Sequence, residues 1–182
     1  MEALRALCSH IVVGTDFSES AERALDTALC LAHAGVTRIT LIHACELSAE
    51  LGVPDPLATP ALDGELVRIA GERLAEAVAC RRGCGVEITG VLRSGRPWEK
   101  INNVAAEVGA SLIVIGRTGA GRGAIADLGH VAVRVLRAAS RPVLTVAGAT
   151  RCLLGGRISS GLPEDRIPPT PRSAAPEPQA GA

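Results

Sequence analysis

The sequence predicts an α/β protein in which helices cover both faces of a parallel sheet. Short apolar runs alternate with stretches of helical periodicity between residues 10 and 147. Two of the loops that follow apolar runs, TDFSES at 15–20 and the glycine-rich segment at 116–129, have an unusual composition. Because ligands of such sheets bind beyond the carboxyl ends of the strands, these two loops are the candidates for a binding site.

The apolar runs predict five strands, at His10–Gly14, Ile39–Ala44, Val86–Leu92, Leu112–Ile115 and Val143–Val146. Ser18 is a suitable N-cap for the first helix, Glu19 and Glu22 suit its first turn, and Gly35 is its expected stop. Residues 47–64 hold three prolines and two glycines and are interpreted as a surface loop. The remaining helices are expected at 66–81, 97–108 and 129–138.

Length and composition indicate one domain, over residues 1–148, in a chain of 182 residues. One Phe, one Trp and no Tyr argue against single-stranded nucleic-acid binding by base stacking. A formal net charge of zero provides no general attraction to nucleic acid or to a membrane surface. The start of the sequence lacks a signal-peptide layout, and no apolar run is long enough to span a membrane, so a cytoplasmic protein is expected.

The segment 149–182 changes character, because it holds six of the 11 prolines of the chain. We expect a disordered tail there, or a tail of which a few residues dock on the domain. The cysteines are expected to be reduced and structural, and Cys30, Cys45 and Cys80 are interpreted as small core residues. Cys80 and Cys84 lie four residues apart, but no second pair or nearby His completes a zinc site.

The glycine-rich segment predicts a phosphate-bearing ligand. Its glycines would let backbone N–H groups approach a ligand closely, and the helix that follows has a partial positive charge at its start. Basic or ionisable donors outnumber the single acid, Asp127; they are Arg117, Arg122 and His130. The alternative is a glycine-rich connection that binds nothing.

Two other nucleotide motifs fit less well. GAGRGA at 119–124 satisfies a dinucleotide fingerprint, but the next strand ends at Val146 and Ala147 without the acid that NAD binding requires. A P-loop is disfavoured as well, because Lys100 is the only lysine in the chain.

Four segments together resemble the universal stress protein family: TDFSESAERAL, LIHA, SGRPWEKI and the final RPVLTVA. The resemblance extends over about residues 8 to 148. It implies a three-layer sandwich with a five-stranded parallel sheet in the order 3-2-1-4-5. It also implies a homodimer through strand 143–146, which that topology places at a sheet edge.

The members of this family that bind ATP have a pattern of Gly, two residues, Gly, nine residues, Gly, then Ser or Thr. This sequence retains Gly116, Gly119 and Gly129 but has His130 in place of the hydroxyl residue. An imidazole can also donate a hydrogen bond to phosphate, although it is bulkier. The implied ligand is ATP or another adenine nucleotide, with or without Mg²⁺.

The resemblance also implies roles for the first loop. Asp16 would accept hydrogen bonds from ribose or adenine, the backbone of Thr15 would frame the base, and Ala44 would lie against the adenine. The alternative for Asp16 is a helix cap only, and His43 is expected to be a core or supporting residue. The complete expected contact set is Thr15, Asp16, Ala44, Gly116, Arg117, Gly119, Gly129, His130 and Val131.

The sequence thus predicts a stress-response protein that binds an adenine nucleotide as a regulatory ligand. One alternative is an interaction and dimerisation module of the same fold with an empty site. Another is a weak ATPase in which Asp127 or His130 positions a water molecule. No nucleophile and base stand out as a pair, so no catalytic residue is assigned.

Overall fold

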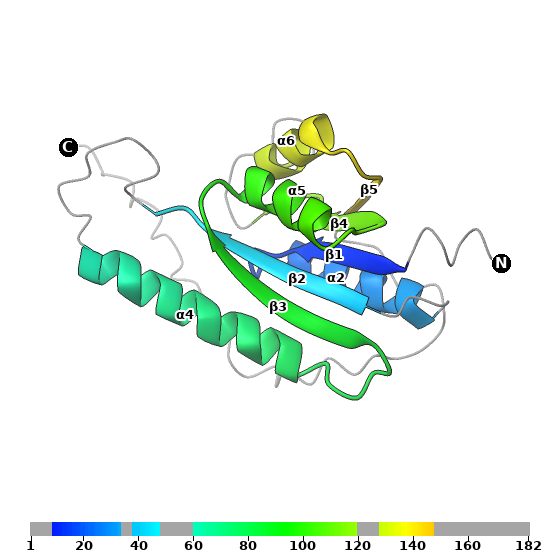
Figure 1. Cartoon of the computed structure of the whole chain (residues 1–182), viewed down its shortest axis with the longest axis horizontal. Coiled ribbons are helices and arrows are strands. Elements are labelled where there is room, and N and C mark those ends of the chain that lie inside the picture. Colours follow the sequence, from blue (N-terminus) through cyan, green and yellow to red (C-terminus); the bar gives the residue numbers. More distant parts are fainter. Residues whose placement is uncertain (1–8, 34–37, 48–59, 120–127, 148–182) are drawn as a thin grey trace, which may run out of the picture.

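The computed structural model describes residues 9–33, 38–47, 60–119 and 128–147. Within these ranges, five strands form one parallel sheet in the order β3-β2-β1-β4-β5, which confirms the expected fold (Figure 1). The strands are β1 His10–Gly14, β2 Arg38–Cys45, β3 Glu87–Ser94, β4 Leu112–Gly116 and β5 Val143–Val146. The helices are α2 Glu19–His33, α4 Pro60–Ala79, α5 Pro97–Glu107 and α6 His130–Ala138.

Helices cover both faces of the sheet, with α2 and α4 on one side and α5 and α6 on the other (Figure 1). Successive residues of a strand point to opposite faces. In β1, Ile11 and Val13 therefore pack with Leu25 and Leu29 of α2 and with Leu74 of α4. Val12 points the other way, into a second cluster with buried residues of α5 and α6, among them Ile101, Val104 and Val135. The central strands are mostly apolar because both of their faces are buried.

The strand register brings the two unusual loops together. The last residue of β1, Gly14, pairs with Ile42 of β2 on one side and with Ile115 of β4 on the other. Parallel strands end at a common edge, so the chain leaves β1 at Thr15 beside the point where it leaves β4 at Gly116. The order reverses at this point, because β2 continues the sheet on one side of β1 and β4 on the other.

Helix termini follow the expected capping rules. Ser18 is the N-cap of α2, since its hydroxyl accepts a hydrogen bond from the Ala21 N–H at 3.3 Å. Pro97 begins α5, where its missing N–H leaves no hydrogen bond unmade. Gly109, with φ at +62°, terminates α5 in a conformation that glycine adopts without strain.

The expected loop over 47–64 is wrong at its end, because α4 already begins at Pro60. Proline is favoured at the first position of a helix, and Gly64 is tolerated on an exposed surface. The first turns of α4 have no buried apolar stripe, since Leu62, Leu66 and Ile69 are all exposed. These three residues recur at helical spacing, but the prolines and glycines of 47–64 favoured a loop over a helix start.

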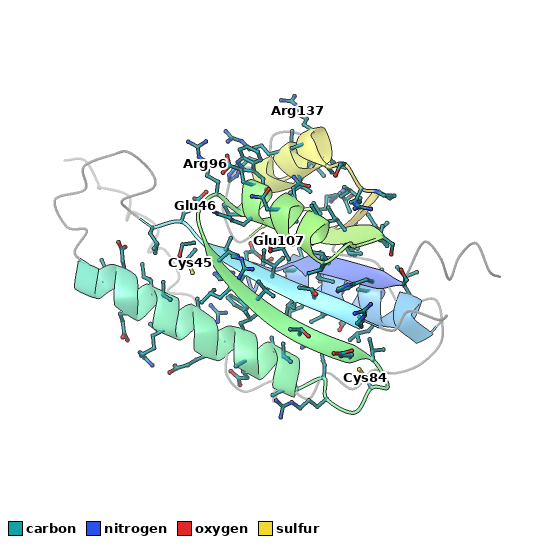
Figure 2. All side chains as sticks on the ribbon, in the orientation of Figure 1. Cys45, Glu46, Cys84, Arg96, Glu107 and Arg137 are labelled. Atoms are coloured by element: carbon teal, nitrogen blue, oxygen red, sulfur yellow. The ribbon has the colours of Figure 1, made fainter. Side chains whose placement is uncertain are left out.

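The expectation for the cysteines is partly wrong. Cys30 is buried as expected, but it is disulfide-bonded, and its partner lies outside the described residues. Cys80 is exposed rather than in the core, because α4 ends just before it at Ala79. Cys45 and Cys84 are half-buried free thiols, and Figure 2 shows them near opposite ends of the sheet.

Several expectations fall outside the described residues. They concern the start of the chain, the helix stop at Gly35, most of the loop before α4, residues 120–127 and the tail after residue 147. In the described part of the chain, no helix has the length and apolar character needed to cross a membrane.

Candidate functional site

Asp16 and Gly119 bring the two loops into direct contact. A Cβ placed on Gly119 would lie 2.7 Å from Oδ2 of Asp16, so only glycine leaves space for the carboxylate in this position. The other carboxylate oxygen, Oδ1, accepts hydrogen bonds from the Ser18 N–H at 3.1 Å and the Ser18 hydroxyl at 2.5 Å. One oxygen is thus held by the start of α2, and the other faces the glycine loop.

Thr15 is fixed by hydrogen bonds within the protein. Its N–H donates to the Ile42 carbonyl at 2.9 Å, and its carbonyl oxygen lies 2.8 Å from Nδ1 of His43. Because a carbonyl can only accept, Nδ1 of His43 carries the proton of this bond. His43 also lies against the ring of Phe17, with ring centroids 4.5 Å apart. His43 is half-buried and contacts both Thr15 and Phe17, so Thr15 has a defined backbone position.

Gly116 and the next residues are held close to the first turn of α2. A Cβ on Gly116 would lie 2.5 Å from the hydroxyl oxygen of Ser20 and 2.8 Å from its carbonyl carbon. The Thr118 N–H donates to the same hydroxyl at 3.4 Å. Ser20 is buried and therefore fixes the direction in which the glycine loop leaves the sheet.

Gly129 lies beside the start of the glycine loop, as the N-cap of α6. A Cβ on this residue would be 3.3 Å from the Arg117 carbonyl oxygen and 3.5 Å from the Gly119 nitrogen. The φ of Gly129 is −64°, so close approach, and not a left-handed backbone, explains the glycine. Its N–H donates to the Arg117 carbonyl at 2.8 Å, which closes the loop against the helix.

Gly129, the N-cap residue of α6, has no side chain that could bond to the backbone N–H groups of the first helical turn. His130 and Val131 begin this turn, and His130 is exposed. A helix start of this kind attracts anions through its free N–H groups and the helix dipole. A Cβ added to Gly129 would be in van der Waals contact with the backbone nitrogen of Gly119. The amide of the glycine loop and the start of α6 are therefore neighbours.

Arg117 and Ala44 complete the expected set. The Arg117 N–H donates to the Val146 carbonyl at 2.8 Å, which extends the β4–β5 pairing by one residue. The Nε atom of Arg117 is buried and has no hydrogen-bond partner among the described residues. Ala44 is half-buried near the end of β2, where it pairs with Arg93 of β3. The structure thus places all nine residues at or near the carboxyl edge of the sheet.

Cys45 lies at the carboxyl edge of the sheet, at the end of β2. Burial raises the pKa of the Cys45 thiol, so this cysteine at the end of β2 is a neutral thiol and a poor nucleophile at neutral pH. In the described ranges, no three His, Cys, Asp or Glu side chains gather where they could share a metal ion.

Sequence reasoning did not assign a role to Phe17, Ser20 or Arg73. Phe17 is the only phenylalanine of the chain and follows Asp16 directly, which was the available signal. Ser20 and Arg73 could not be found from sequence, because their contacts join α2 to β4 and α4 to the turn after β1.

A parallel sheet whose order reverses beside a glycine loop and a helix start defines a doubly wound α/β protein, and its carboxyl edge is the candidate binding site. The model of the universal stress protein family matches residues 8–147. The chain belongs to the universal stress protein family.

Solved structures of universal stress proteins have the same fold. One, from Burkholderia pseudomallei, is 31% identical with a TM-score of 0.60, over 77% of this chain and 96% of that chain. The Archaeoglobus fulgidus protein in complex with dAMP is 30% identical with a TM-score of 0.56, over 75% and 95%. A universal stress protein in complex with cAMP is 26% identical with a TM-score of 0.54, over 76% and 96%. No curated protein matches this sequence.

Proposed function

We propose that this universal stress protein binds ATP or another adenine nucleotide between the loop after β1 and the loop after β4, as a regulatory ligand in a stress response. The observation that carries this proposal is the contact of Asp16 with Gly119 beside the start of α6, where Gly129 provides no side-chain cap. The carboxylate can accept hydrogen bonds from a sugar hydroxyl or a base amino group. It lies next to backbone N–H groups that can donate to phosphate. The dAMP and cAMP complexes of two similar family members support an adenine nucleotide.

In this proposal each loop recognises one part of the ligand. Thr15 and Ala44 border the base, and Oδ2 of Asp16, which faces the glycine loop, accepts hydrogen bonds from ribose. Gly119, Gly129 and Val131 provide the space and the backbone donors for phosphate, while Arg117 and His130 add charge-assisted donors. A Mg²⁺ ion would accompany a triphosphate as its counter-ion and not as a resident metal.

Calorimetry with ATP and with AMP at neutral pH tests the proposal. We expect saturable heat and a raised thermal midpoint in the presence of either nucleotide. Mass spectrometry of the protein purified without added nucleotide would show whether a ligand is retained from the cell. The absence of both heat and thermal shift at millimolar ATP and AMP would contradict nucleotide binding.

A second candidate function is an interaction module that acts through β5. This strand pairs only with β4 among the described strands, and Leu144 on it is 36% exposed. An apolar side chain on an edge strand favours pairing with another chain. Nucleotide binding and dimerisation can coexist, so the two proposals are tested separately.

A further inference from the structure

Phe17 has an unusual backbone conformation within the candidate site. Its φ is 59°, and among the described residues it is the only one other than glycine with a positive φ. A bulky side chain is unfavourable in this left-handed region. Such a residue persists only where its surroundings hold it in place, and this occurs most often at functional sites.

Three contacts hold Phe17 in this conformation. Its N–H donates to the hydroxyl oxygen of Thr15 at 3.0 Å. Its ring lies 4.5 Å from the imidazole of His43, tilted by 34°. The guanidinium carbon of Arg73 lies over the same ring, 4.5 Å from its centroid. The contacts come from the turn itself, from β2 and from α4, so three separate elements fix one residue.

Arg73 provides the one of these three contacts that comes from a helix packed on the sheet. It lies on α4, whose position on the sheet is set by the buried side chains of Ala70 and Leu74. A guanidinium above an aromatic face within about 6 Å is attracted to the ring. The cation therefore links α4 to the turn that carries Asp16.

The conformation of Phe17 determines where the carboxylate of Asp16 lies. Asp16 is between Thr15 and Phe17 in the chain, so both of its backbone neighbours are fixed. With the turn in this form, Oδ1 reaches the Ser18 N–H and Oδ2 faces Gly119. A relaxed backbone at Phe17 would rotate the following peptide group and release the Ser18 contact.

We propose that Arg73 is a positioning residue for the nucleotide site: through its cation–π contact with Phe17, it holds the Asp16 carboxylate toward the glycine loop. This inference rests on the proposed function, because it assigns Asp16 to the ligand. Arg73 lies outside the expected contact set and acts through Phe17. Nucleotide affinity thus depends on the packing of α4, which connects the site to a surface helix.

The test compares two charge-removing variants of the same helix. Arg73→Met keeps an unbranched side chain but loses the cation. Arg68→Met is the matched control, since the described partners of Arg68 are Glu65 and Glu72 of its own helix. By calorimetry with AMP, we expect the Kd of Arg73→Met to rise about two- to fivefold, the equivalent of one cation–π contact. Arg68→Met should retain the wild-type Kd, and Arg73→Lys should restore most of the affinity. Equal Kd values for Arg73→Met and Arg68→Met would overturn the proposal.

A double variant separates positioning from a general structural effect. If Arg73 acts through Asp16, Arg73→Met should cause no further loss of AMP affinity in an Asp16→Asn background. The same fold-loss in both backgrounds would show that Arg73 acts elsewhere.

Amide hydrogen exchange at Ser18 gives a readout that needs no nucleotide. The Ser18 N–H is bonded to Asp16, so its exchange should accelerate in Arg73→Met and stay unchanged in Arg68→Met. If the wild-type protein binds neither AMP nor ATP, the proposed function fails, and this exchange rate alone decides whether Arg73 holds the turn. Unchanged exchange in Arg73→Met would refute the link between Arg73 and Asp16.

Discussion

The hydroxyl and backbone of Ser20 occupy the space into which a side chain on Gly116 would project. A Cβ on Gly116 would lie 2.5 Å from Ser20 Oγ and 2.9 Å from the Ser20 carbonyl oxygen. Backbone atoms cannot move aside as the end of a flexible side chain can. The end of β4 and the first turn of α2 are therefore in contact because residue 116 has no side chain.

Gly116→Ala should destabilise the fold. Because the added methyl group meets the backbone of Ser20 inside a packed site, we expect a loss of about 1–3 kcal/mol in the free energy of unfolding. Gly64→Ala is the matched control, since no atom lies within 4 Å of a Cβ there and the residue is on a helix. The control should gain about 0.5–1 kcal/mol. Urea denaturation measures the free energy of unfolding of both variants. Equal stability of the two would contradict the inference that β4 and α2 are in contact because residue 116 has no side chain.

Gly119→Ala and Gly129→Val should weaken nucleotide binding without unfolding the domain. The methyl group on residue 119 would displace only the Asp16 carboxylate, an exposed and movable group. A Cβ on residue 129 is just accommodated at 3.3 Å, but the branched atoms of valine would extend over the start of α6. Calorimetry and thermal unfolding check this prediction, and wild-type ATP affinity in a folded Gly129→Val protein would refute it.

His130 should provide a side-chain hydrogen bond to the phosphate of the nucleotide. It is exposed in the first turn of α6, and an imidazole N–H can donate to a phosphate oxygen. His130→Ala should therefore weaken ATP binding, whereas His130→Ser supplies the hydroxyl found in other family members and should retain it. Calorimetry at neutral pH measures both affinities. Wild-type ATP affinity in His130→Ala would show that the imidazole does not contact phosphate.

His10 should make stability depend on pH at the opposite end of the sheet. Burial first, and the charge of Arg38 second, lower the pKa of this histidine from 6.5, against weaker opposing effects of Val108 and Glu87. The unfolded chain then binds a proton more readily than the folded one, so stability is full above about pH 6.5 and falls as the pH decreases below it.

Urea denaturation between about pH 5 and 8 measures this effect. His10→Gln keeps a polar group for Thr40, whose hydroxyl is 2.8 Å from Nε2 of His10, but removes the titration. The variant should lose less stability on acidification than the wild type. Identical pH profiles would assign the acid sensitivity to other groups.

Dimerisation should depend on the exposed edge of β5. Leu144→Lys places a charge on this edge and should reduce self-association. Leu136→Lys places the same charge on another exposed leucine, on α6, and should leave self-association unchanged. Light scattering at tens of micromolar measures the molar mass of the full chain, both variants and a chain ending near residue 150. A monomeric wild type and a monomeric shortened chain would contradict the dimer; a dimer of the shortened chain alone would identify the tail as a cover for the edge.

Local sequence determined the elements of this protein because each has its own periodicity. His10–Gly14 and Val143–Val146 were predicted with the bounds observed, because each is a short and mostly apolar run. Ser18 marked the start of the first helix because its side chain caps the turn that directly follows it. The motif glycines were located for the same reason, because their spacing is visible along the chain.

Tertiary structure decided what depends on residues distant in sequence. The start of α4 at Pro60 was missed because the prolines and glycines around it are also typical of a loop. The disulfide of Cys30 could not be distinguished from a buried thiol. The contacts of Gly119 with Asp16, Gly116 with Ser20 and Arg73 with Phe17 join segments tens of residues apart. Such contacts follow from how the helices pack on the sheet, and packing depends on the whole set of buried side chains, which no local pattern encodes.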